Sequence, residues 1–209
     1  MLLHKYSDPV NFRFPEEINQ NPIIINNKEY SIDIKDLGTN VFKLSINHKD
    51  WQYTSQAVYS EDIFAQEIST FSFELGSNGY WQILQNKKPC LQAHPQYAFG
   101  VCGAKWIFSL KKESDMYFYG MGEKNIGMER SGKKVNFWNM DVLWDFHYEQ
   151  VETQETDPMY VSIPYLLIKR KEVCIGILID NPYNVFISTP RRDYSRHEEK
   201  NDFYFGSRN

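Results

Sequence analysis

Apolar and polar side chains alternate with a period of two along several stretches of this 209-residue chain. Tyr30, Ile32 and Ile34 alternate with polar neighbours, and the same pattern recurs over residues 42–46 and 71–75. Successive side chains of a strand point to opposite faces of a sheet, so the apolar set lies on one face and the polar set faces water. Half-buried strands of this kind are typical of antiparallel sheets.

Further strand-like segments follow with turn residues between them. They cover residues 80–84, 106–110, 160–169, 173–179, 185–187 and 203–205. The segment 173–179 is almost entirely apolar, which favours a central strand covered on both faces. Residues 60–68 are the only helix candidate in the sequence, and the helix would be short. The pattern predicts an all-β fold, a large antiparallel β-sandwich with at most one short helix, formed as a single domain over residues 1–209.

Composition and net charge limit the kinds of molecule that the chain is expected to bind. Aromatic residues make up 16% of the chain, which suits strands because flat side chains pack well on a pleated surface. The formal net charge is −4, so no basic face for nucleic acid is expected. No apolar run is long enough for a signal peptide or a membrane span. The three cysteines have no metal-site spacing and are interpreted as reduced, buried thiols of a cytoplasmic protein.

Three motifs between residues 116 and 168 carry the most specific information. The first, YGMGE at residues 119–123, places Gly120 and Gly122 at alternate positions. Glycine weakens a strand interior, so this pair indicates a bend or a close approach of another backbone. The second motif is FWNMD at residues 137–141, and the third is DPMYVSIP at residues 157–164.

In this order and at this spacing, the motifs resemble the N-terminal domain of glycoside hydrolase family 31, the family of α-glucosidases and α-xylosidases. The resemblance is strong over residues 116–187 and diffuse before them. It implies a galactose-mutarotase-like β-sandwich that serves as an accessory domain of a sugar-cleaving enzyme. Gly120, Gly122, Glu123, Asp157 and Pro158 are the structural residues of the resembled motifs.

Catalysis is expected to lie outside this chain. Glycoside hydrolysis needs two facing carboxyl groups, and the family carries its nucleophile in a W-x-D-M-N-E motif that is absent here. A (β/α)₈ barrel takes roughly 250 residues, more than the whole chain. We therefore expect the catalytic barrel to follow residue 209 and assign no catalytic residue, no cofactor and no metal ligand to this chain.

The resemblance implies a supporting role at the substrate entrance. The family's N-terminal sandwich projects a loop over the barrel, and the acidic residue of that loop, which contacts substrate hydroxyls, corresponds to Asp141. A carboxylate suits this role because it accepts strong hydrogen bonds from hydroxyl groups. Trp138 and Trp144 are candidates for stacking against a sugar ring. The expected partners are an α-linked oligosaccharide or glucoside and the C-terminal barrel, with no nucleic acid or membrane.

Two other functions remain open at this point. The chain could be a free-standing carbohydrate-binding module. It could also be a sugar epimerase of the mutarotase type, which would use His147 with Glu123 or Glu149 as acid and base. For Glu123 the alternative is structural, with the carboxylate accepting hydrogen bonds from backbone donors at the glycine bend.

Overall fold

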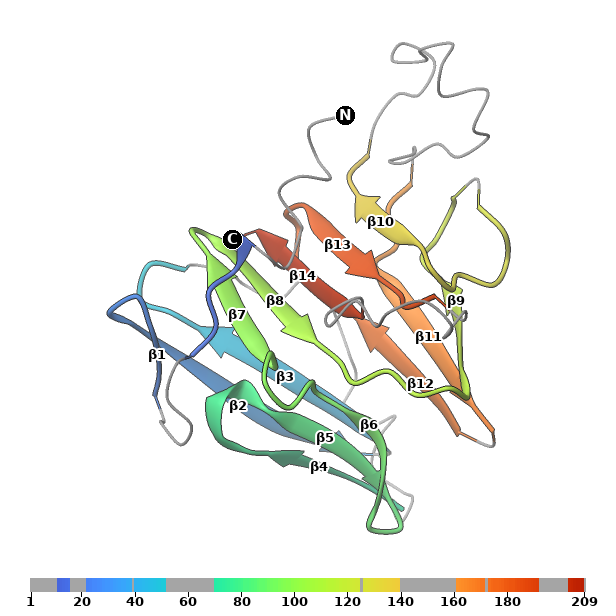
Figure 1. Cartoon of the computed structure of the whole chain (residues 1–209), viewed down its shortest axis with the longest axis horizontal. Coiled ribbons are helices and arrows are strands. Elements are labelled where there is room, and N and C mark those ends of the chain that lie inside the picture. The colour runs from blue at the N-terminus through green and yellow to red at the C-terminus, as the bar shows by residue number, and fades with distance from the viewer. Residues whose placement is uncertain are drawn as a thin grey trace. The chain divides into compact units, whose positions relative to one another are not determined.

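A computed structural model of the chain describes residues 11–15, 22–38, 40–51, 70–124, 126–139, 161–171, 173–191 and 203–208 (Figure 1). Its strands are β1 (Ile23–Ile25), β2 (Lys28–Gly38), β3 (Val41–Asn47), β4 (Phe71–Leu75), β5 (Trp81–Gln85), β6 (Lys88–Gln92), β7 (Phe99–Cys102), β8 (Lys105–Ser109), β9 (Met116–Gly120), β10 (Lys134–Phe137), β11 (Tyr165–Arg170), β12 (Val173–Leu178), β13 (Val185–Ser188) and β14 (Tyr204–Arg208). Among the described residues one complete 3₁₀ turn is present, η4 (Ser77–Gly79), and Asn11 also has 3₁₀ conformation. The predicted all-β fold is confirmed, and the helix predicted over residues 60–68 lies outside the described residues.

Backbone contacts divide the chain into two compact units. The described residues of the N-terminal unit fall within Val10–Lys111, and those of the C-terminal unit within Lys112–Arg208. That residues 1–209 form a single domain stays a prediction.

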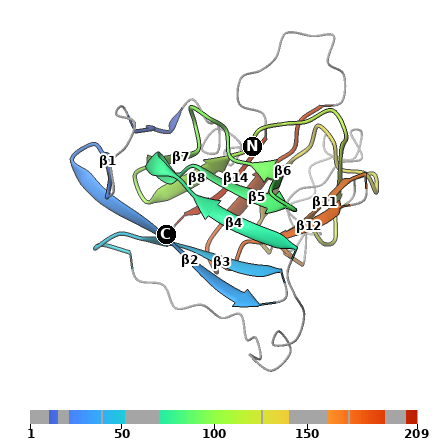
Figure 2. The ribbon, with the colours of Figure 1, turned by 90° about the horizontal axis from the view of Figure 1, so that it is seen from below.

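The N-terminal unit contains two three-stranded antiparallel sheets and one hairpin. β1, β2 and β3 form one meander, β4, β5 and β6 form another, and β7 pairs with β8 (Figure 2). The alternation predicted from the sequence is seen in β2, where Tyr30 and Ile32 are buried and Asp33 is exposed. In β2 the apolar face that the sequence predicted is therefore present, whereas the side chains of β3 up to Ile46 are all partly exposed.

Aromatic side chains form the core of the N-terminal unit. Phe99 and Phe108 are opposite each other in the β7–β8 register, are almost fully buried, and have ring centroids 5.2 Å apart. Tyr30 of β2 lies 5.9 Å from Phe99, and Trp81 of β5 lies 6.3 Å from Phe108, both edge to face. Such pairs stabilise a core beyond the area that they bury.

The C-terminal unit contains two groups of antiparallel strands. β11 lies between β12 and β9, and β13 lies between β10 and β14 (Figure 1). Phe118 of β9 packs edge to face against Phe203 at 5.1 Å, just before β14. The largest fully buried side chains of this unit include Phe118, Met121, Leu166, Ile168, Val185, Ile187, Phe203 and Tyr204.

Three interpretations of the sequence are wrong. β12 is not a central strand, since among the described strands it pairs only with β11, and Leu178 is 57% exposed. β11 begins at Tyr165 instead of residue 160, because Pro164 has no N–H to donate to a ladder. The thiols are not all buried, since Cys102 is partly exposed and Cys174 on β12 is exposed. An apolar run cannot by itself distinguish an edge strand from a central one.

Candidate functional site

The glycine motif ends β9 in a bend with left-handed backbone. Gly120, Met121 and Gly122 have φ angles of 87°, 66° and 68°. A Cβ on Gly120 would lie 2.6 Å from the carbonyl oxygen of Tyr165, and a Cβ on Gly122 would lie 2.9 Å from Cβ of Ile163. Side chains at these two positions would therefore collide with the segment that leads into β11. The close approach predicted from the alternate glycines is confirmed.

Arg130 holds the bend from inside. Its guanidinium donates hydrogen bonds to the carbonyl oxygens of Gly120, Ile126 and Gly127. Its backbone N–H donates to the carbonyl of Phe118 at 2.8 Å, and the side chain is only 8% exposed. Burial lowers the pKa of Arg130 because the charged form loses its hydration. The buried guanidinium thus provides hydrogen-bond donors for three carbonyl groups, whose loop forms no regular β-ladder.

A neighbouring carboxylate satisfies backbone donors of the same loop, but it belongs to Glu129. Its oxygens accept hydrogen bonds from the N–H of Phe118 at 3.0 Å and from the N–H and hydroxyl of Ser131. Glu123, the carboxylate considered for this role from the sequence, has an exposed side chain. The loop is thus anchored from its interior by Glu129 and Arg130, to which the sequence reasoning assigned no structural role.

A pocket forms where β10 ends, because β10 and β13 run antiparallel with Phe137 opposite Val185. This register places Trp138 and Asn139, which follow β10, beside the turn that precedes β13. The N–H of Ile179 donates to the carbonyl of Pro164 at 3.0 Å and holds the entry to β11 against the end of β12.

The pocket has a volume of about 400 Å³. The described residues that line it are Phe137, Trp138, Asn139, Ser162, Pro164, Asn181, Pro182, Tyr183 and Val185. None of these nine side chains is charged. Trp138 is 49% exposed and Tyr183 is 46% exposed, so both aromatic rings are open to solvent. Aromatic rings beside amide and hydroxyl groups offer stacking surface together with hydrogen-bond donors and acceptors.

The glycine bend supports one wall of this pocket. Met121 donates its N–H to the carbonyl of Tyr165 at 2.7 Å, and Gly122 lies directly against Ile163. Ile163 is adjacent to two lining residues, Ser162 and Pro164. The bend therefore fixes the segment that carries Ser162.

Lys124 contacts β10, the strand that leads to Trp138. Its buried ammonium group donates a hydrogen bond to the carbonyl of Asn136 at 2.7 Å and lies 5.2 Å from the centroid of the Phe137 ring. This contact ties the loop after β9 to the strand that delivers Trp138.

Of the predicted binding residues, Trp138 lines the pocket. Asp141 and Trp144, the motif residues Asp157 and Pro158, and the epimerase candidates His147 and Glu149 lie outside the described residues. Tyr183, Asn181 and Ser162 line the pocket but were not predicted to do so. The sequence marked residues 180–184 only as a turn, and the aromatic residue beside Pro182 was the one available signal for an exposed ring.

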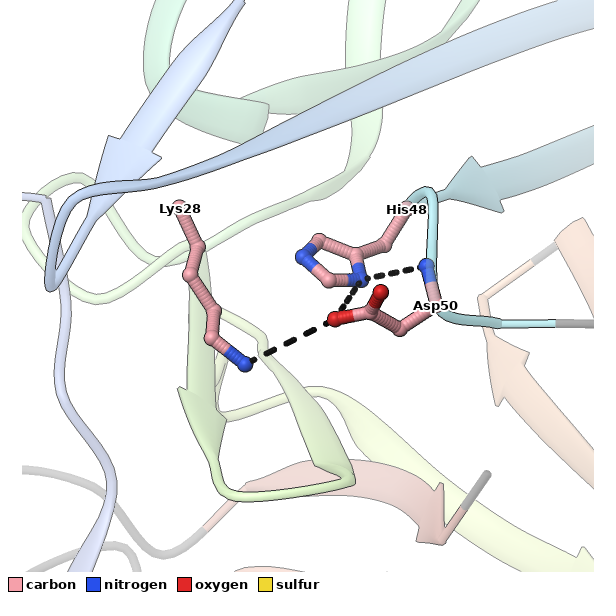
Figure 3. Close-up of polar contacts among 3 residues, drawn as sticks. All are labelled: Lys28, His48 and Asp50. Carbon is pink, nitrogen blue, oxygen red and sulfur yellow. Dashed lines mark hydrogen bonds and ion pairs between the residues drawn. The ribbon is translucent and has the colours of Figure 1, made fainter.

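A second polar group involves His48, at the end of β3 in the N-terminal unit (Figure 3). Its buried ring stacks on Tyr30 with centroids 4.7 Å apart. Nδ1 accepts a hydrogen bond from the N–H of Asp50 at 3.1 Å and lies 3.8 Å from the carboxylate, while Lys28 Nζ lies 3.9 Å from the same carboxylate. Since Nδ1 is an acceptor, the neutral ring carries its proton on Nε2.

This second group closes the turn after β3, where the N–H of Trp51 donates to the carbonyl of His48 at 2.9 Å. Burial, and secondarily the charge of Asp50, raises the pKa of Tyr30 above its ordinary value. Within the described ranges, no cluster of three or more His, Cys, Asp or Glu side chains could hold a metal ion. No described helix is long and apolar enough to cross a membrane.

The fold of the described residues is all-β, and the described lining of the pocket contains no carboxyl group. The chain belongs to the family of glycosyl hydrolase 31 N-terminal galactose mutarotase-like domains, whose family model matches residues 10–187. The resemblance noted in the motifs is thereby confirmed, as is the predicted antiparallel β-sandwich of the galactose-mutarotase-like class. The chain is therefore a glycoside hydrolase domain.

Among curated proteins, alpha-glucosidase 2 of Bacillus thermoamyloliquefaciens is 36% identical over 86 residues, which are 41% of this chain and 10% of that protein. Among solved structures, a GH31 dextranase of Flavobacterium johnsoniae complexed with glucose matches 94% of this chain and 25% of its own, with a TM-score of 0.63 and 18% identity. The cycloalternan-forming enzyme from Listeria monocytogenes, in complex with a pentasaccharide substrate, matches 95% of this chain and 19% of its own, with a TM-score of 0.62 and 13% identity.

At these identities the solved structures show a common fold. The chain spans a quarter or less of each of these three relatives.

Proposed function

We propose that this chain is the non-catalytic N-terminal domain of an α-glucosidase-type glycoside hydrolase, active in carbohydrate metabolism in the cytoplasm. Its substrate would be an α-linked oligosaccharide or glucoside, and its partner the (β/α)₈ barrel of the same protein. The observation that carries the proposal is the family match over residues 10–187. The uncharged lining of the described pocket agrees with it, since hydrolysis needs two facing carboxyl groups.

The proposed contribution to catalysis is the loop that begins at Trp138 and carries Asp141 and Trp144 to the substrate entrance. Support comes from the start of this loop, where Trp138 and Asn139 already line an open pocket. Asp141 would accept hydrogen bonds from sugar hydroxyls, and Trp144 would stack against a ring. Because Asp141 acts on binding and orientation, it is proposed as a substrate-binding residue.

Activity measurements test this proposal. The 209-residue chain alone should not hydrolyse p-nitrophenyl α-glucoside, whereas the complete gene product should. In the complete protein, Asp141→Asn should lower kcat/KM by about 10- to 100-fold, since a hydrogen bond to a charged group contributes roughly 1.5–3 kcal/mol. Hydrolysis by the 209-residue chain itself would overturn the proposal.

Glu123→Gln is the matched control, because Glu123 is an exposed carboxylate of the same motif region. It should leave kcat/KM within about twofold, as expected for a surface substitution. If the two substitutions had equal effects on kcat/KM, the specific role of Asp141 would be wrong.

A further inference from the structure

Strand β10 leads directly to Trp138 and Asn139, and among the described strands it pairs only with β13. The N–H of Thr189 donates to the carbonyl of Lys133 at 2.9 Å, just before the two strands begin to pair. Hydrogen-bonding direction alternates from residue to residue along an antiparallel pair. The carbonyl of Asn136, three residues after Lys133, therefore points away from β13 and needs a donor from elsewhere.

Lys124 supplies that donor. Its ammonium group lies 2.7 Å from the carbonyl oxygen of Asn136 and 5.2 Å from the centroid of the Phe137 ring. Lys124 is only 9% exposed, and Asn136 and Phe137 are each 3% exposed. Hydrogen bonds from a charged donor are shorter and stronger than neutral ones, so this contact holds the last two residues of β10.

The other end of the contact is also held in place. Lys124 follows the glycine bend by two residues. In that bend Gly122 lies against Ile163, and Met121 donates its N–H to the carbonyl of Tyr165 at 2.7 Å. Lys124 thus connects a tightly packed bend to the point where the chain leaves β10.

The hydrogen bond, and not the packing of the side chain, is what lysine contributes at this position. Methionine would fill much of the same space without the desolvation cost of a buried ammonium group. It would offer no donor to the carbonyl of Asn136. A directional bond to the backbone of β10 is therefore the property that only a cationic or amide side chain could supply here.

We infer that Lys124 is a positioning residue of the substrate entrance, because its bond to Asn136 sets the direction in which the chain leaves β10. The inference rests on the proposed function, in which Asp141 of the following loop binds the substrate. Lys124 is not among the described lining residues of the pocket, so it acts through Asn136 and Phe137. Its loss should impair substrate binding and leave the chemical step unchanged.

Kinetics of the complete gene product test the inference. Lys124→Met should raise KM for p-nitrophenyl α-glucoside by about tenfold and leave kcat within about twofold, as expected when binding alone is weakened. Lys124→Arg retains a cationic donor and should return KM to within about threefold of the original value. If Lys124→Met does not fold, Lys124→Gln replaces it, since its shorter, uncharged side chain weakens the same bond and should raise KM several-fold.

Arg170→Met is the matched control. It also removes a cation from the C-terminal unit, but Arg170 pairs with Asp115 and does not contact β10 or the described pocket lining. Its KM should equal that of the unchanged protein. Near-ultraviolet circular dichroism and the Tm establish that each variant is folded.

A double-mutant cycle shows whether Lys124 acts through the loop. The double variant Lys124→Met, Asp141→Asn should have about the same kcat/KM as Asp141→Asn alone, because the contact that Lys124 positions is already lost. Additive losses in kcat/KM would show that Lys124 acts elsewhere and would overturn the inference.

Trp138 provides a measurement that does not require turnover. In NMR spectra of the 209-residue chain, its indole N–H resonance can be identified from its absence in Trp138→Phe. This resonance should shift in Lys124→Met and stay in place in Arg170→Met, because only Lys124 contacts the residues that precede Trp138.

Either an unchanged KM or an unchanged Trp138 resonance in the folded Lys124→Met variant would overturn the inference. Failure of the proposed function gives a different result, since the complete protein with Lys124 in place would then not hydrolyse the glucoside. In that case the Trp138 resonance of the 209-residue chain still decides whether Lys124 holds the end of β10.

Discussion

Two hairpin turns of the N-terminal unit and the glycine bend of the C-terminal unit all use left-handed backbone, but they depend on different residues. In the N-terminal unit, positive φ angles occur in two-residue hairpin turns, with Asn26 and Asn27 between β1 and β2, and Asn86 and Lys87 between β5 and β6. Both central residues of a type I′ turn require positive φ, and asparagine tolerates it well. These turns follow from neighbouring residues alone.

The glycine bend of the C-terminal unit depends on distant residues. Gly120 and Gly122 lie against Tyr165 and Ile163, more than 40 positions further along the chain, and Arg130 holds the carbonyls. Met121, between the glycines, has positive φ and a fully buried side chain. A β-turn needs suitable local residues, whereas this bend needs β11 to be in place. The bend also supports the pocket wall, so packing and the candidate site are coupled.

The largest expected effect is the loss of Arg130. Arg130→Met retains a long, unbranched side chain but removes the guanidinium group, which leaves three carbonyl groups without their donor. Unfolding in urea should show a loss of about 5 kcal/mol, since each unsatisfied buried group costs roughly 1–3 kcal/mol. A stability close to that of the unchanged chain would show that the bend is held by local preference, as the hairpin turns are.

Arg170→Met is the matched control in the same unit. Arg170 forms a part-exposed ion pair with Asp115, with N–O distances of 2.9 and 3.0 Å. Solvent screens such a pair, so its loss should cost only about 1 kcal/mol.

A smaller effect is expected from alanine at glycines with positive φ. Gly120→Ala combines left-handed strain with a collision against the Tyr165 carbonyl and should destabilise the chain by about 4 kcal/mol. Gly103→Ala, in the β7–β8 turn, has a similar φ of 61° and nothing within 4 Å of the added Cβ, so it should cost about 1 kcal/mol. Urea unfolding of both variants measures the difference, and equal costs would remove the distinction between the two kinds of turn.

The smallest effect on stability is expected at a local turn whose histidine, His94, titrates. Nδ1 of His94 accepts hydrogen bonds from the N–H groups of Gln96 and Tyr97, both at 3.2 Å. Burial lowers the pKa of His94 below 6.5. The unfolded chain then binds more protons, so this residue's contribution to stability is present above pH 6.5 and is lost as the pH falls through the lowered pKa.

His94→Asn retains a side-chain hydrogen-bond acceptor that suits a turn, but it removes the titrating imidazole ring. Unfolding of this variant between pH 7.5 and 5 should show a shallower decline in stability than the unchanged chain. Parallel declines in the two proteins would exclude His94 as the group responsible.

Strand positions could be predicted from the sequence to a large extent because alternation reports burial on one face. β2, β3, β4 and β8 lie where the pattern placed them. β1, β7 and β10 were missed, since each has only three or four residues and too few positions to show a period. The sequence pattern also could not predict that β12 is an edge strand, because a run of apolar residues is compatible with an edge strand and with a central strand.

The candidate site was predicted in part. The glycine motif indicated a close approach of backbone, and FWNMD indicated Trp138 as a binding residue. Tyr183 is 45 positions away, and only the β10–β13 register places it beside Trp138. Arg130 was given no structural role from the sequence, because its three acceptors are backbone carbonyls, which a pattern of side chains does not reveal.

The sequence alone determined the all-β class, the family and the places where the chain must bend, because side-chain period and glycine are properties of neighbouring residues. The tertiary structure decided which strand lies at an edge, which cation holds the glycine bend and which residues meet in the pocket. Those features depend on strand register, and register is set by pairing between segments far apart in the chain.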